Sequence, residues 1–379
     1  MFSATQWLSV SPADDHCQRK QAKQERRFSY EYGQITGGAV RFLTEAHLLA
    51  PSDCPSRGKE AKQLFTNHFG IEVEFTGITR RQAAKVAAKY LCGTITTLHD
   101  YYGTYQVTAQ DGRVWKFMYD GSIVCQCKEH NQTVSANRAY SVEMVSPVLL
   151  YREDIDKLQG LARRLRKAGG FINHSCGIHI HLDGSNHTPR SIRNFVNIIA
   201  SHNDLFYKAL QIEPERMRYC KKMDAWLVHQ MNQAKPTTFA GIESIWYEGY
   251  RENRNQHYHS SRYHFLNLHS FFHGHHTVEL RGFNGTLHAG KIRAYIVLAL
   301  ALNNQALTQK SASYRKVQEE NEKFAMRVYL NRIGFIGPEF KNCREHLYRH
   351  LSGNAAWRYG SRENVRSHIG RNGGHNSEQ

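Results

Sequence analysis

The sequence predicts an α+β fold, in which clustered strands pack against longer helices. Short alternating segments typical of strands are followed by helical segments, but strand and helix do not alternate regularly as in a doubly wound sheet. Two of the alternating segments flank Gln110-Asp111-Gly112, which is typical of a β-hairpin. Hydrophobic residues make up 40% of the chain and charged residues 22%, which is the composition of a globular protein.

The expected elements follow from periodicity and from capping residues. Thr188-Pro189 predicts the start of a helix, and Gly169-Gly170 predicts the end of another. We expect strands at 69–75, 104–109, 113–119, 140–145, 177–183, 263–269 and 277–283, and helices near 80–90, 154–168, after 188, 291–307, 314–333 and 339–351.

The two ends of the 379-residue chain differ from its middle. Residues 1–65 show little sustained periodicity, and the residues after 360 are rich in Asn, Arg, Ser, His and Gly. We therefore expect an N-terminal extension at 1–65, a catalytic domain at 66–310, C-terminal helices at 311–360 that pack on it, and a disordered tail at 361–379.

Charge and cysteine usage indicate the compartment and the class of partner. Fifty Lys and Arg residues against 33 Asp and Glu residues leave a net charge of +17, which favours anionic partners. The longest apolar run, 294–302, is shorter than the roughly 20 residues of a membrane helix, and no secretory signal is visible. Eight scattered cysteines, with Cys125 and Cys127 as the only close pair, predict reduced thiols and a cytoplasmic protein.

Four of the expected strands place acidic or imidazole side chains on one face. Residues two apart in a strand point the same way, so Glu72 pairs with Glu74, and His179 with His181. Glu143 and the Glu279–Arg281 pair repeat the pattern on two further strands. A solvated face of an amphipathic sheet is the plain alternative for any one strand. Several glutamates on one face would repel one another without cations, and carboxylates with an imidazole suit Mg²⁺ or Mn²⁺.

The motifs as a series resemble the amidoligase enzymes of the carboxylate–amine ligase superfamily, relatives of glutamine synthetase and glutamate–cysteine ligase. The resemblance covers about residues 66–305. It rests on five motifs in order, namely Phe69–Phe75, Val142–Pro147, Cys176–Asp183, Arg262-Tyr263 with Asn267, and Thr277–Thr286. It implies a glutamine-synthetase-like antiparallel sheet that forms a half-barrel, with helices packed outside and with ATP and divalent metals on the concave face.

The resemblance also implies a role for each motif residue. Glu279 would bind metal and take part in catalysis beside Arg281, which would meet the phosphate being transferred. The nucleotide would lie near His181, Arg262, Asn267 and Arg218. The metal ligands implied are Glu72, Glu74, Glu143, His179 and Glu279.

The implied activity joins a carboxylate to an amine at the expense of ATP, with Mg²⁺ or Mn²⁺ as the metal. Activation of the carboxylate as an acyl phosphate would precede attack by the amine, and the substrates expected are amino acids or peptides. A metal-dependent hydrolase that uses the His-x-His strand is the main alternative, because such strands also bind Zn²⁺ and activate water. A nucleic-acid-binding protein is the weaker alternative, since no recognised nucleic-acid fold signature accompanies the basic clusters.

We predict that limited proteolysis trims residues before about 60 and after about 360 and leaves a stable fragment, because these ends contribute few periodic apolar residues. Mass spectrometry of the fragments checks this. Ends that resist digestion as firmly as the middle of the chain would show that they have a structural role.

Overall fold

The structure of the protein is a computed structural model in which residues 66–317 and 320–359 are described. The expected N-terminal extension and the expected disordered tail lie outside these residues. The division into a catalytic domain and C-terminal helices stays a prediction.

The central feature is a nine-stranded sheet in the order β10-β11-β9-β1-β7-β4-β3-β2, with β8 paired to β1. Each of its strand pairs in the described part of the chain is antiparallel. The α+β class is therefore confirmed, whereas the glutamine-synthetase-like half-barrel stays a prediction. The strands span His68–Phe75 (β1), Thr94–Thr97 (β2), Tyr105–Thr108 (β3), Val114–Met118 (β4), Val142–Val145 (β7), Leu149–Leu150 (β8), Gly177–Asp183 (β9), Leu266–Asn267 (β10) and Thr277–Asn284 (β11).

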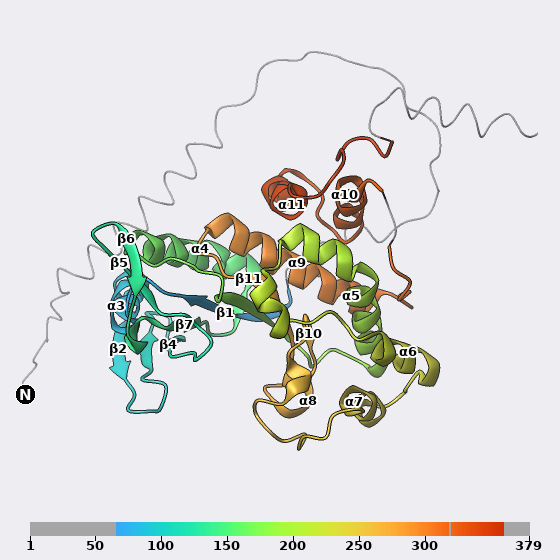
Figure 1. Ribbon diagram of the computed structural model, residues 1–379, viewed down its shortest axis with the longest axis horizontal. Helices are drawn as coiled ribbons and strands as arrows, with labels where there is room; N and C mark the ends of the chain where they lie inside the picture. The colour runs from blue at the N-terminus through green and yellow to red at the C-terminus, as the bar shows by residue number, and fades with distance from the viewer. Residues whose placement is uncertain (1–65, 318–319, 360–379) are drawn as a thin grey trace, which may run out of the picture. The chain divides into compact units, whose positions relative to one another are not determined.

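One face of the sheet is apolar and is covered by helices. Its inward side chains include Val73 of β1, Met144 of β7 and Ile180 of β9, all fully buried. Figure 1 shows helices α4, α5 and α9 on this side of the strands, and α7 and α8 on the other side. The helices of this part of the chain are Arg80–Leu91 (α3), Tyr151–Lys167 (α4), Pro189–Leu210 (α5), Ala225–Ala234 (α6), Phe239–Tyr247 (α7), His269–His273 (α8) and Ala289–Thr308 (α9).

Helix α9 is the centre of the helical layer. Its residues from Ala294 to Asn304 are all buried, as expected for a helix that is surrounded by protein. It contacts β9 on the sheet side and α4, α5 and α11 around it. None of the helices in the described residues is long and apolar enough to cross a membrane.

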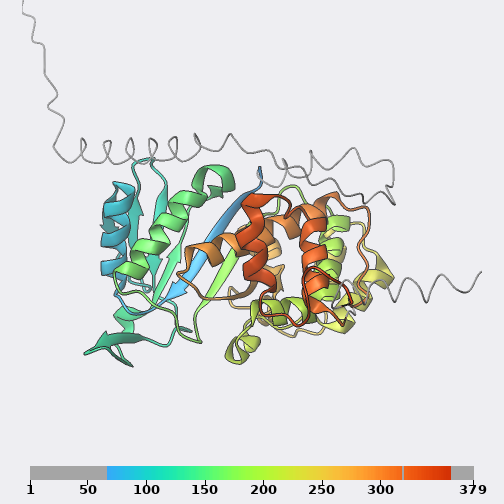
Figure 2. The same cartoon turned by 90° about the horizontal axis from the view of Figure 1, so that it is seen from above.

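The last two helices form an outer layer. Helices α10 (Glu322–Arg332) and α11 (Lys341–Tyr348) pack against each other, and α11 also packs on α9 and α5. Seen from above in Figure 2, both lie over the layer that contains α9. The helix expected at 314–333 begins only at Glu322, where Asn321 accepts a hydrogen bond from the Phe324 backbone amide as an N-cap.

Two sequence expectations near the fourth motif need correction. The strand expected at 263–269 is only Leu266–Asn267, and His269–His273 forms α8 instead. Strands β10 and β11 nevertheless pair as expected, with Asn267 opposite Glu279.

Short 3₁₀ turns span Arg138–Tyr140 (η1), Pro214–Arg218 (η2), Ser260–Arg262 (η3) and Pro338–Phe340 (η4).

A separate two-stranded hairpin, β5 (Gln126–Glu129) and β6 (Gln132–Ser135), includes Cys127. Cys125 and Cys127 are free thiols, as expected, and so are Cys176, Cys220 and Cys343. Cys92 is disulfide-bonded, so the expectation of reduced cysteines does not hold there. The cytoplasmic localisation stays a prediction.

A buried ion pair joins the sheet to the start of α4. Arg113, beside β4, donates two hydrogen bonds to the carboxylate of Asp154, at 2.8 Å and 2.6 Å. The Leu150 backbone amide donates a third, at 2.9 Å, and the Asp154 side chain is 3% exposed. Burial alone would raise the pKa of Asp154, but Arg113 and the amide outweigh it and lower the pKa.

Asp154→Asn is expected to lower the free energy of unfolding by about 1–3 kcal/mol at pH 7, because it removes charge-assisted hydrogen bonds. A lowered carboxyl pKa contributes stability above the unfolded-state pKa of about 3.9, and that stability is lost as the pH falls through the folded-state value. Urea unfolding at pH 7 and near pH 3 should therefore show the difference from the parent shrinking in acid. Glu153→Gln, at an exposed residue of the same helical turn, is the control. An equal loss in both variants would point to the helix terminus instead.

Candidate metal centre

The strand order brings four glutamates together on the face opposite the apolar side chains. β1 lies between β7 and β9. Glu72 is opposite His179 of β9, and Glu74 is opposite Glu143 of β7. On the other side of β9, Glu279 is opposite His181. Directly opposite residues have Cβ atoms about 5 Å apart on the same face of the sheet. The pairing of the strands is therefore enough to bring these side chains together.

His179 is at the centre of the cluster. Its Nδ1 lies 2.9 Å from a Glu72 carboxylate oxygen and 3.8 Å from one of Glu279, while its Nε2 lies 3.6 Å from Glu74. The two ring nitrogens thus face different carboxylates, Nδ1 those of Glu72 and Glu279 and Nε2 that of Glu74, so His179 offers a ligand atom to either side of the cluster.

At the other end of the cluster, Glu279 is held by side chains of two strands, β10 and β11. Arg281 donates from Nη1 to Glu279 Oε1 at 2.5 Å, and Asn267 Nδ2 donates to Glu279 Oε2 at 2.6 Å. The pairing of β11 with β9 is irregular between Leu280 and Phe283, so Arg281 lies within a bulge. The bulge does not separate the pair, since both Glu279 and Arg281 are buried on the acidic face.

The cluster holds more negative charge than its basic neighbours neutralise. Burial raises the pKa of Glu143 well above its ordinary value, and the nearby carboxylates of Glu72, Asp120 and Glu74 raise it further. A bound cation would offset the repulsion between these carboxylates.

The remaining charged groups are stabilised in their ionised forms. Burial alone would raise the pKa of Glu279, but Arg281, His181 and His179 lower it to about 2. For His181, Glu72 and Glu279 outweigh the effect of burial and raise its pKa to about 9. Burial opposes ionisation of Glu72 as well, yet His181 and His179 hold its pKa well below the ordinary value.

Arg216 is a member of this site that the sequence did not reveal. It is 2% exposed, its Nη1 lies 3.8 Å from Glu74, and its Nη2 donates to the Arg281 carbonyl at 3.2 Å. A Cβ on Gly177 would lie 2.0 Å from Arg216 Nη1, so only glycine at this position allows the guanidinium to cross the start of β9. The backbone amide of Gly177 also donates to Glu74 Oε2, at 2.6 Å.

Arg218 was predicted near the nucleotide, but the structure brings Arg216 to the cluster instead. Arg218 is exposed and lies over the ring of Tyr219. In the short turn η2, residues two apart do not share a face as they do in a strand. Arg218 therefore does not contact the carboxylates in this structure, and its predicted role near the nucleotide stays a prediction.

The other three residues predicted near the nucleotide, which stay predictions, differ in their contacts with the carboxylate cluster. Asn267 contacts Glu279, and His181 lies 3.2 Å from Glu72 Oε1 and 3.1 Å from Thr277 Oγ1. Arg262 lies on η3, where it donates to the His257 carbonyl. Among the described residues it has no hydrogen bond or ion pair with the cluster, so the structure does not join it to the metal ligands.

The residues present fit a divalent metal. Two groups bring their ligand atoms within 4.8 Å of one another, Glu72–His179–Glu279 and Glu74–Glu143–His179. Both groups consist of carboxylates and one shared imidazole, a donor set that suits Mg²⁺ or Mn²⁺ better than a soft metal. These are the five residues implied as metal ligands by the resemblance, and the structure brings all of them together.

Comparison with known protein families identifies the class. The model of the family described as "Putative amidoligase enzyme" matches residues 66–303, which is more than half of the chain. The chain belongs to this family of ligases. The comparisons with curated proteins and with solved structures each found no match.

We predict that Mn²⁺ binds to the parent protein and raises its melting temperature, and that EDTA reverses the rise. Glu74→Gln and Glu279→Gln should each weaken Mn²⁺ binding at least about tenfold, because each removes a charged ligand from the cluster. Electron paramagnetic resonance of free Mn²⁺ measures the affinity. Glu248→Gln, at an exposed residue, is the control. Parental affinity in both cluster variants would show that these glutamates are not the ligands.

Proposed function

We propose that the protein is an ATP-dependent ligase that joins a carboxylate to an amine, with an amino acid or a peptide as substrate. The observation behind this proposal is the combination of a buried carboxylate cluster with Arg281, in a chain that belongs to an amidoligase family. Metal ligands and a phosphate-binding guanidinium at one place are what phosphoryl transfer from ATP requires.

The chemistry itself calls for activation. Formation of an amide from a carboxylate and an amine in water is uphill, so the carboxylate needs a better leaving group than hydroxide. Transfer of the γ-phosphoryl group of ATP to a carboxylate oxygen forms an acyl phosphate and ADP. The amine then attacks the acyl carbon, the C–O bond to phosphate breaks, and inorganic phosphate leaves as the amide forms.

In this proposal Glu72, Glu74, Glu143, His179 and Glu279 hold Mg²⁺ or Mn²⁺. The bound metal would supply charge stabilisation for the phosphate oxygens. The chain's own contribution is orientation. The amide of Gly177 and the guanidinium of Arg216 fix Glu74, and Asn267 fixes Glu279.

Arg281 is the proposed catalytic residue. Glu279 accepts a hydrogen bond from its Nη1, and its buried Nε has no hydrogen-bond partner among the described residues. Burial alone would lower the pKa of Arg281, but Glu279, Glu72 and Glu74 raise it, so the guanidinium stays charged. A rigid fork with an unused donor suits a phosphoryl group on which negative charge is building.

The His-x-His strand gives less support to the alternative of a zinc hydrolase. Only His179 belongs to the two candidate metal groups, whereas His181 faces Glu72 and Thr277. Catalytic zinc sites use three protein ligands and commonly include two or three histidines. A site with one imidazole among several carboxylates favours the ligase.

Arg281→Lys is expected to lower the rate of ADP formation about a hundredfold while ATP affinity changes much less, because lysine keeps the charge but loses the fork. The assay supplies ATP, Mg²⁺ and a panel of amino acids and peptides, and detects the amide product by mass spectrometry. Arg81→Lys, at an exposed position of α3, is the matched control.

Two outcomes would contradict the proposal. One is amide cleavage that proceeds without ATP and is insensitive to Arg281→Lys, which would favour the hydrolase. The other is parental turnover in Arg281→Lys, which would reduce its pair with Glu279 to a structural contact.

A further inference from the structure

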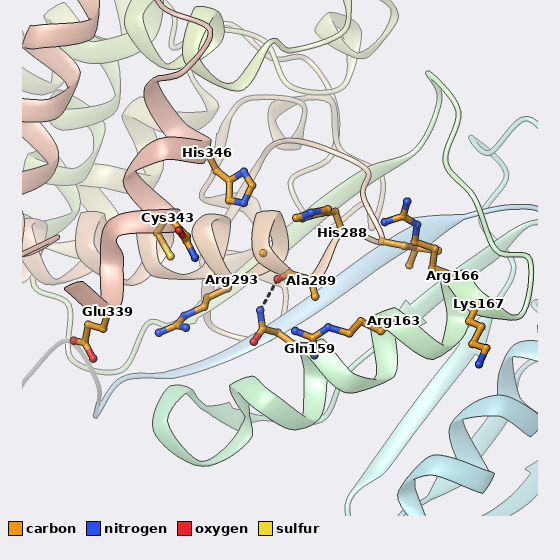
Figure 3. Close-up of a pocket in the computed structure, with 13 residues that line it drawn as sticks. Gln159, Arg163, Arg166, Lys167, His288, Ala289, Arg293, Glu339, Cys343 and His346 are labelled. Carbon is orange, nitrogen blue, oxygen red and sulfur yellow. Dashed lines mark hydrogen bonds between the residues drawn. The ribbon is translucent and has the colours of Figure 1, made fainter. Parts of the chain in front are cut away.

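A second basic site lies on the helical side of the sheet. An open cavity of about 690 Å³ is lined by α4, by the start of α9 and by η4 with α11. Leu287 lines this cavity, and Phe75 is on the apolar face of β1. Both would contact a Cβ placed on Gly170, at 3.1 Å and 3.4 Å, so the cavity is on the face opposite the glutamates. Figure 3 shows the basic side chains of α4 on one side of it and His288 and His346 on the other.

The cavity gathers positive charge without matching acids. Arg163, Arg166, Lys167 and Arg293 line it, against one carboxylate, that of Glu339. Within the described part of the chain, Arg163, Arg166 and Lys167 form no ion pair. Burial lowers the pKa of His288, and the positive charges of Arg166 and Lys291 lower it further.

Unused hydrogen-bond donors face the same space. The start of α9 lines the cavity, and the backbone amides of Ala289 and Gly290 have no acceptor among the described residues. A helix N-terminus of this kind favours anions. His346 of α11 also lines the cavity, and its ring lies 5.2 Å from that of His288.

The absence of a side chain at Gly290 keeps the space between the two imidazoles open. A Cβ there would lie 2.9 Å from His346 Nε2 and 3.1 Å from His288 Cε1. Gln159 donates to the Ala289 carbonyl at 2.8 Å and so fixes α4 against the first turn of α9. The donors are therefore held by packed helices and not by a loose surface loop.

We propose that this cavity binds a small molecule that bears two or more phosphate groups. Four cationic side chains against one carboxylate call for a multivalent anion, and each phosphate monoester carries between one and two negative charges near neutral pH. Arginine forks and helix amides bind phosphate oxygens directly. The volume falls within the roughly 300–1,000 Å³ of small-molecule sites, which exceeds what a single phosphate fills.

The site is distinct from the centre of the proposed ligase, because the sheet separates the two. Binding here needs no divalent metal, since the chain itself supplies the positive charge. That difference allows the two sites to be tested separately.

Isothermal titration of the full chain with pyrophosphate in the presence of EDTA tests the proposal. We expect one site in the parent and an affinity at least about tenfold lower in the double variant Arg163→Ala/Arg166→Ala, which loses two charge-assisted contacts. The matched control, Arg81→Ala/Lys85→Ala, removes the same charge from exposed positions of α3 and should retain the parental affinity.

Two further variants test whether pyrophosphate binding depends on the shape of the cavity and whether it is independent of the metal centre. Gly290→Leu keeps every charge but fills the space beside His346, so it should also weaken pyrophosphate binding. Glu279→Gln should bind pyrophosphate as the parent does, so a failed ligase assay leaves this result intact.

Three outcomes would overturn the proposal. The first is that the parent does not bind pyrophosphate. The second is that the α3 control and the α4 variant lose equal pyrophosphate affinity. The third is that the protein does not bind pyrophosphate but binds a single-stranded RNA in a way that depends on Arg163 and Arg166. The last would make the cavity part of a nucleic-acid surface.

Discussion

The concentration of carboxylates on the central strands is the constraint on which the site depends. Glu72, Glu74, Glu143 and Glu279 meet in a region where three of the four are held by hydrogen bonds or ion pairs. Burying such charges costs several kcal/mol each unless partners neutralise them. The chain supplies Arg281, Arg216 and His181 as basic partners, while burial and the neighbouring carboxylates raise the pKa of Glu143. A cation would offset the remaining repulsion, and the residues present fit a divalent metal.

The rest of the fold holds the strands that carry these glutamates in fixed positions. β1 is paired on both sides, and its alternate residues are fully buried under the helical layer. Helix α9 lies at the centre of that layer and is buried from Ala294 to Asn304, where it packs against β9. Side chains anchored in this way have few alternative positions, and preorganised donors are what a phosphoryl-transfer site needs.

The two faces of the sheet therefore have opposite electrostatic character. The acidic face gathers glutamates that call for cations, while the cavity between α4, α9 and α11 gathers arginines that call for anions. The net charge of +17 hides this division, since it reports only the sum. Part of the positive charge belongs to a defined cavity on the helical side, and it does not require a nucleic acid to explain it.

Within each strand, the sequence by itself determined which side chains share a face. Because side chains in a strand alternate with a period of two, Glu72 was predicted to share a face with Glu74, and His179 with His181. The hairpin at Asp111-Gly112 was also predicted correctly. The five metal-ligand candidates also came from the sequence, through family motifs in a fixed order. These features are local, because they depend on residues that are neighbours in the chain.

Only the tertiary structure decided how the strands combine. The order β11-β9-β1-β7 joins segments more than 200 residues apart, and pairing between distant strands leaves no periodic signal in either strand. For the same reason the sequence pointed to Arg218 and missed Arg216. Which arginine of a short turn faces inward depends on the space that Gly177 leaves on another strand, and that space exists only once β9 and η2 have packed together.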